Sequence, residues 1–377
     1  MKIKIPYILT VCISIALIFI GHKIAMNGFD INQRDPQEIV KASVHKIIER
    51  IKPDGTGDFI SLQEDKIIFE ARIREGNQKG EIVTASQNLV SFTTAEVKQR
   101  EVREGDHILL INSGSLGWYF NGYVRTNKLL VLGILFAVCV LVFGRKKGFN
   151  TILSLGLTCA AVFAVFIPSI LSGKNIYLMA ALVCTYTTMM TLLIVSGFNK
   201  KSFAAAAGAM SGIVVTGLIT VIMDRVLFLS GIIDEHSRYL ANLPLAVPIN
   251  LRAIIFAGII IGAMGAIMDV AMSISSSLWE IKEKAKLVNF KMLFRSGLNI
   301  GRDILGSMAN TLILAYIGTS LSLVLLLGVY SDSLTSLFNM EMIVVEILQA
   351  LAGSFGILFA IPLSSFFSAT FYLKDKE

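Results

Sequence analysis

The stretch that decides the fold is LRAIIFAGIIIGAMGAIMDVAMSISSS, residues 251–277. A helix needs about 17–25 mostly apolar residues to cross the hydrocarbon core of a bilayer, and this run is long and apolar enough to do so. Its second half contains an aspartate, Asp269, among alanine, isoleucine, valine and methionine. The stretch therefore predicts a membrane-spanning helix that contains a carboxylate.

The composition of the whole chain agrees with this prediction. Hydrophobic residues make up 54% of the 377 residues and charged residues 16%, a balance typical of proteins that cross a membrane several times. The net charge of +7 comes mostly from short Lys and Arg clusters between hydrophobic runs, where such clusters set membrane topology. We therefore expect the lipid bilayer as the main partner, and no nucleic acid.

Further apolar runs lie along the chain. We predict an all-α polytopic membrane bundle of about eight transmembrane helices, near residues 5–23, 128–144, 149–172, 176–197, 202–229, 251–277, 304–330 and 342–373. The first run is longer than the apolar region of a usual signal peptide, and no A-x-A cleavage site follows it. We predict that residues 1–24 form an uncleaved anchor, with a cleaved signal peptide as the alternative.

Basic residues favour one orientation of these helices. If the N-terminus is cytoplasmic, every inside loop carries lysine or arginine, as the positive-inside rule requires; these clusters lie within residues 145–147, 200–201, 282–295 and 374–376. This orientation places both termini in the cytoplasm and the polar segment 25–127 outside.

The segment 25–127 has the pattern of a small β-domain. Runs such as DKIIFEARIRE (65–75) and GEIVTASQNL (80–89) are β-branched or alternating, and turn-forming stretches such as KPDGTGD (52–58) separate them. A closed or half-open barrel buries such short strands without leaving edges. We predict an extracytoplasmic β-barrel-like domain inserted after the first helix, followed by a membrane domain of about seven helices over 128–377. The β-domain is either a spacer or a binding module.

Small and polar residues share one face of the 251–277 helix, at steps of three or four residues: Gly258, Gly262, Gly265, Asp269 and Ser273. An isolated charge in mid-membrane costs about 2.5–3.5 kcal/mol, so we expect this stripe to face protein, with the glycines as packing positions. Asp269, assisted by Ser273, is then either a protonatable or cation-binding group, or a group that only hydrogen-bonds a neighbouring helix.

Two later helices carry further polar groups. Asp303 and Asn310 lie on one face of the next helix, which is consecutive and antiparallel, and they are candidate partners of Asp269. Glu346 begins a stripe of the last helix that contains Gly353 and Gly356, two further packing positions. If the three helices pack together, carboxylates lie near both mouths of one seam. The candidate ion- or substrate-responsive residues are Asp269, Ser273, Asp303, Asn310 and Glu346.

Signals of enzymatic chemistry are poor. The four histidines are scattered, no Cys/His pair has metal-ligand spacing, and no G-x-x-x-x-G-K-[ST] run occurs. We expect no catalytic residues, no metal and no cofactor, and therefore no enzyme.

Three segments resemble a known family. GAIMDVAMSISSS (265–277), SGLNIGRDILGSMANTLILAYIG (296–318) and LAGSFGILFAIPLSS (351–365) look like signature segments of the YibE/F family of bacterial multipass membrane proteins, of the YibE-like type. The resemblance implies residence in the bacterial plasma membrane, but it carries no settled activity. It also implies a YibF-like membrane partner, with a homo-oligomer as the alternative.

A more distant resemblance bears on function. The order of the Asp269 helix, a basic connector and the Asp303 helix is similar to the core of the SecD/SecF and RND permeases, and those proteins use membrane carboxylates in proton-driven work. We predict a permease-like protein that moves a small solute or ion, with proton coupling as one form of this activity. The alternative is a non-transporting membrane scaffold whose outside domain recruits a partner.

Overall fold

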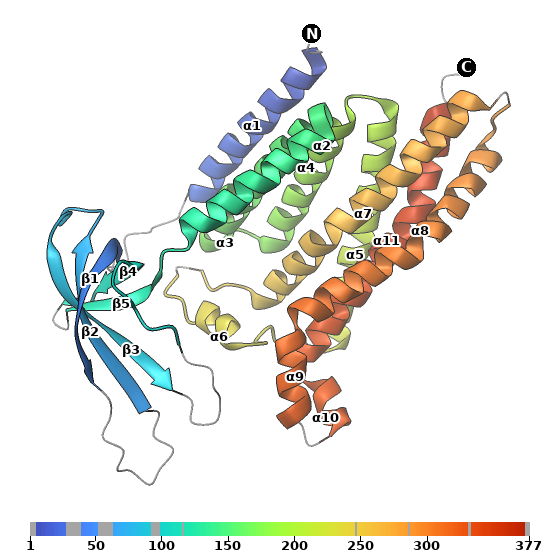
Figure 1. Ribbon diagram of the computed structural model, residues 1–377. Helices are drawn as coiled ribbons and strands as arrows, with labels where there is room; N and C mark the ends of the chain where they lie inside the picture. Colours follow the sequence, from blue (N-terminus) through green and yellow to red (C-terminus); the bar gives the residue numbers. More distant parts are fainter. Residues whose placement is uncertain are drawn as a thin grey trace. The chain divides into compact units, whose positions relative to one another are not determined.

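The computed structural model describes residues 5–27, 39–51, 63–91, 99–114, 117–245, 247–285, 287–330 and 333–373 (Figure 1). The chain divides into two compact units. One unit combines Met1–Asp30 with Val140–Glu377 and is helical; the other, Ile31–Cys139, holds the strands and the start of one long helix.

The second unit contains the predicted small barrel. Its strands are β1 (Ile39–Ile51), β2 (Gln63–Ile73), β3 (Ile82–Ser91), β4 (His107–Asn112) and β5 (Trp118–Tyr123). They close in the order β1-β2-β3-β5-β4, with β3 and β5 parallel and the other neighbours antiparallel, an arrangement of the OB type. Alternate residues point inward and form the core, among them Val40, Ala42, Val44, Phe69, Ile108 and Leu110.

The helices are α1 (Ile5–Met26), α2 (Thr126–Ala160), the π-helix η2 (Ala161–Phe166), α3 (Ile167–Leu171), α4 (Ile176–Ser196), α5 (Lys200–Val226), α6 (Glu235–Ala241), α7 (Leu251–Lys284), α8 (Phe290–Thr319), α9 (Leu321–Tyr330), α10 (Leu334–Asn339) and α11 (Glu341–Leu373). An asparagine side chain caps the N-terminus of each of α4, α5, α7 and α8 by accepting a backbone N–H bond; the caps are Asn175, Asn199, Asn250 and Asn289.

Within the described residues, six helical segments are long and apolar enough to cross a membrane, fewer than the eight predicted. The predicted spans 128–144 and 149–172 are counted together within the segment Thr126–Leu171, but two helices meet there at a kink at Arg145 (φ 48°, ψ −124°), as the prediction of two spans requires. Gly148 lies against the carbonyl of Val140, whereas residues eight apart in a straight helix are about 12 Å apart. The chain therefore bends sharply between the two predicted spans.

The predicted span 304–330 also differs from the structure. α8 begins at Phe290 and ends at Thr319, and α9 begins after Ser320. α8 is not among the six apolar segments, because it carries basic and polar residues along one side.

The helical core forms where α5, α7, α8 and α11 pack together. α5 and α11 cross most closely because small residues meet there: Gly208 lies against Ser364, and Gly356 lies against Thr216. α1 packs against η2, α3 and α4. It is held by the Tyr7 hydroxyl, which donates to Asn150 Oδ1 at 2.8 Å.

Candidate functional site

α7 presents two faces of different character. Its buried face packs into the helical core through alanines and large aliphatic residues, including Ala257, Ile260, Ala263, Ile267, Val270, Ala271 and Ile274. The opposite face carries the small and polar stripe, and there Gly258, Gly265, Asp269 and Ser273 are exposed on the chain. Apart from Gly262, the stripe does not face protein within the described part of the chain, contrary to our expectation. On α7, the alanines of the buried face, and not the glycines of the stripe, allow neighbouring helices to approach closely.

The three stripe glycines have different surroundings. Gly258 and Gly265 have no heavy atom within 4 Å of the position that a Cβ would take. At Gly262, that position lies 2.7 Å from the hydroxyl of Tyr316 and 3.7 Å from Nε2 of Gln349. Only Gly262 therefore sits at a helix junction of the chain itself, where α7, α8 and α11 meet.

α11 contributes the remaining predicted residues. Gly353 and Gly356 lie at close crossings: a Cβ at Gly353 would be 2.8 Å from Leu312, and one at Gly356 would be 2.7 Å from Ile267. Glu346 is half-buried near the N-terminus of α11, where it acts electrostatically on Tyr316. Glu346 thus belongs to the α7–α8–α11 junction and not to the stripe around Asp269.

Asp269 has no hydrogen bond or ion pair with any residue that the structure describes. It is exposed, yet it lies well inside the apolar part of a 34-residue helix. A carboxylate in that position, surrounded by lipid, would be costly. The arrangement leaves a carboxylate that is available to a ligand, to water or to another chain.

The predicted partners on α8 do not reach Asp269. Asp303 and Asn310 are exposed, and no hydrogen bond or ion pair joins them to Asp269 among the described residues. The cause is the rotation of α8: Gly297 and Gly301 turn toward α11, against Ser365 and Ile361. The polar side of α8 therefore points away from the core.

Together, α7 and α8 form two polar stripes at the surface of the helical unit. Leu278 of α7 lies beside Gly297 of α8, and Gly262 lies beside Tyr316, so the two helices run side by side in opposite directions. These two contacts place Asp269 at the level of the middle of α8, between the levels of Asp303 and Asn310 along that helix.

Sequence reasoning missed Tyr316. It follows an apolar run, LILAY, and nothing in its spacing distinguishes it from a core aromatic residue. Its position opposite Gly262 and Gln349 depends on the crossing of three helices. Among the described residues, no three His, Cys, Asp or Glu side chains lie close enough together to hold a metal ion.

Several long apolar helices indicate a membrane-embedded protein. The family model for YibE/F-like proteins matches residues 132–374. The chain therefore belongs to the YibE/F family. No curated protein and no solved structure matches the chain, so these comparisons lend no support to the more distant similarity to the SecD/SecF and RND permeases.

Proposed function

We propose that the protein is a permease-like membrane protein that moves a small solute or ion, with Asp269 as the ion-responsive group. The observation that carries this proposal is the exposed carboxylate of Asp269 in the apolar part of α7, which has no hydrogen bond or ion pair among the described residues. Ionisable residues inside membrane helices usually face a bundle interior or a water-filled path, and they mark ion and substrate pathways. Gly265 and Ser273 flank Asp269 on the same stripe and leave room for such a path.

The path forms against a second chain. A single chain exposes the stripe of α7 and the polar side of α8, and lipid is a poor environment for both. A second copy or a YibF-like membrane protein would cover these two stripes and enclose the polar groups between the chains. Asp303 and Asn310 would then line the same enclosure as Asp269.

The proposed setting is the bacterial plasma membrane, with both termini in the cytoplasm and residues 25–127 outside. The break at Arg145 supports this topology, because it places a basic cluster, residues 145–147, at the turn between two apolar segments. Basic clusters favour the cytoplasmic side of a membrane. Reporter fusions after residues 114 and 199 would test the topology, since they are expected on opposite sides.

The alternative function is a membrane scaffold. The same exposed stripes would then be a helix-packing interface without a path, and the barrel would recruit a partner outside. Under this alternative, Asp269 only hydrogen-bonds the second chain. Its replacement would then weaken assembly with that chain, and the weaker assembly would account for any loss of activity.

The test compares two amide substitutions in a strain that lacks the protein. Untargeted ion and metabolite profiling of the deletion strain first defines the activity; each variant is then scored for rescue, for folded yield and for assembly. Asp269→Asn should fold and assemble normally but fail to rescue. The control is Glu280→Gln, which should rescue fully. Glu280 lies near the end of α7, and its carboxylate is 3.9 Å from the Lys284 ammonium. Full rescue by Asp269→Asn would refute the proposal, and a loss explained by poor assembly would favour the scaffold.

A further inference from the structure

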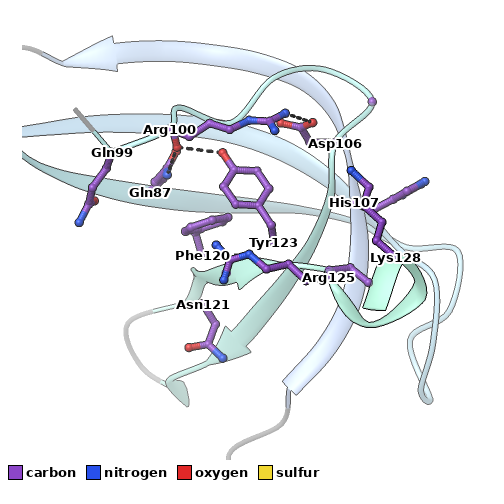
Figure 2. Close-up of a pocket in the computed structure, with 13 residues that line it drawn as sticks. Gln87, Gln99, Arg100, Asp106, His107, Phe120, Asn121, Tyr123, Arg125 and Lys128 are labelled. Atoms are coloured by element: carbon purple, nitrogen blue, oxygen red, sulfur yellow. Dashed lines mark hydrogen bonds and ion pairs between the residues drawn. The ribbon is translucent and has the colours of Figure 1, made fainter. Parts of the chain in front are cut away.

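The barrel carries a cavity of about 630 Å³ at the point where β5 leads into α2. The start of β4, the strand β5 and the connection before β4 surround it, and the rings of Phe120 and Tyr123 lie along it (Figure 2). A cavity of this size suits a small organic ligand. All of its lining residues belong to the barrel unit, so the site is independent of the Asp269 stripe.

Positive charge is in excess in this cavity. Asp106 is the only acidic residue of the lining, and its carboxylate is already engaged by Arg100 Nη2 at 2.9 Å and by the backbone N–H of Arg103 at 3.0 Å. Arg125 and Lys128 have no side-chain hydrogen bond or ion pair with the described residues. Two basic groups are therefore available to an anion.

Hydrogen bonds within the barrel hold one wall of the cavity in place. The Tyr123 hydroxyl and Gln87 Nε2 both donate to the carbonyl of Arg100, at 2.8 and 3.0 Å. The backbone N–H of Val102 donates to Gln87 Oε1 at 2.9 Å, and the Arg100 guanidinium lies 4.9 Å from the centroid of the Tyr123 ring. The Tyr123 phenol is neutral at physiological pH, because the pKa of a phenol is about 10 and burial raises the pKa of Tyr123 further; it therefore does not repel an anion.

The free basic groups lie next to the apolar part of α2. Lys128 is in the first turn of the helix, and the residues that follow it are exposed on all sides, with Leu129 64% and Val131 65% exposed. Such a helix emerges directly into lipid. The cavity thus opens where an apolar span begins, which is the level of phosphate groups in a bilayer.

We propose that this cavity binds a phosphate group attached to a small organic moiety. Arg125 and Lys128 hold the phosphate oxygens, since a guanidinium can donate two parallel bonds to them. The rings of Phe120 and Tyr123, which meet edge to face with centroids 5.1 Å apart, pack against the attached carbon skeleton. A bare phosphate ion would leave most of the cavity unfilled. The phosphate belongs either to a phospholipid headgroup or to a soluble phosphate ester.

The test measures ligand binding to the purified full-length protein in a neutral detergent. Native mass spectrometry and microcalorimetry are run with three probes: phosphatidylglycerol, phosphatidylcholine and glycerol 3-phosphate. The double variant Arg125→Gln/Lys128→Gln is compared with Arg74→Gln/Lys79→Gln, which removes the same charge from exposed positions at another site on the barrel. A further variant, Arg125→Lys/Lys128→Arg, keeps the charge.

The Arg125/Lys128 glutamine variant should lose affinity about 100-fold, roughly tenfold for each charge-assisted contact. The control should stay within about threefold of the unmodified protein. The charge-keeping variant should lose less affinity than the glutamine variant, because it keeps both charges, but it should lose some, because a lysine at 125 cannot donate two parallel bonds. Binding of phosphatidylglycerol alone identifies a lipid headgroup, whereas binding of glycerol 3-phosphate as well identifies a soluble ester. An equal loss in both glutamine variants, or no binding of any anionic probe, would overturn the proposal.

Discussion

Gly212→Ala should destabilise the helical unit, because α5 and α11 cross there without room for a methyl group. A Cβ at this position would lie 2.8 Å from Ile267 Cγ2, 2.9 Å from the carbonyl oxygen of Gly356 and 3.0 Å from Ala360 Cβ. Favourable contacts need about 3.5–4.0 Å, and the backbone of α11 can give way only by moving the whole helix. Overpacking of this kind costs about 1–3 kcal/mol, and the better helix propensity of alanine offsets about 1 kcal/mol of it.

The net loss is therefore up to about 2 kcal/mol, which corresponds to a fall of up to about 8 °C in melting temperature for a unit of this size. The assay is the thermal unfolding of the purified full-length protein in detergent, followed by tryptophan fluorescence. Gly156→Ala is the matched control: Gly156 lies in α2 with no heavy atom within 4 Å of the Cβ position, so its melting temperature should be unchanged or slightly higher. If Gly212→Ala melts at the same temperature as Gly156→Ala, α5 and α11 do not cross as closely as described.

Two further predictions concern polar contacts outside the helical core. The Glu341 carboxylate accepts three bonds, from the backbone N–H groups of Ser230 and Gly231, both at 2.7 Å, and from the Ser230 hydroxyl at 2.8 Å; Glu341→Gln should lower stability by about 1–3 kcal/mol in the same assay. Burial and the carboxylate of Asp106 raise the pKa of Tyr123 above 10.0. The folded barrel therefore keeps the phenolic proton to higher pH than the unfolded chain does. This contribution to stability is complete below about pH 10 and is lost as the pH rises through the folded-state pKa. The unmodified protein should therefore be less stable at about pH 11 than at about pH 8 in denaturation curves, and Tyr123→Phe should reduce that difference in the free energy of unfolding.

The parts of the fold that local pattern determines were predictable from the sequence. Alternating β-branched runs between turn-forming stretches indicated the barrel, since a strand of a small barrel must bury every second residue. The long apolar runs matched α4, α5, α7 and α11 to within a few residues at most ends, apart from the C-terminal extension of α7 to Lys284. Here a single property, an apolar length sufficient for a bilayer, decides the outcome.

The surroundings of the candidate site were not predictable in the same way. Helical spacing correctly placed Gly258, Gly265 and Asp269 on one face, but spacing does not say which face a neighbouring helix covers. On α7, a second face that is rich in alanine and isoleucine is the one that the neighbouring helices bury. The stripe around Asp269 is therefore left exposed on the chain. The rotation of α8, which carries Asp303 outward, follows from the glycines that contact α11 and is a tertiary effect.

The covering of this stripe can be tested directly by cysteine substitution at Gly265. In a background with the four native cysteines replaced by serine, Gly265→Cys projects a thiol into the open space beside α7. A water-filled path predicts rapid labelling by a polar maleimide in native membranes, and a second copy packed on the stripe predicts a disulfide-linked dimer on mild oxidation. Ala271→Cys, on the buried face of α7, should do neither. If Gly265→Cys neither labels nor cross-links, lipid or a different protein covers the stripe, and a water-filled path beside Asp269 is excluded.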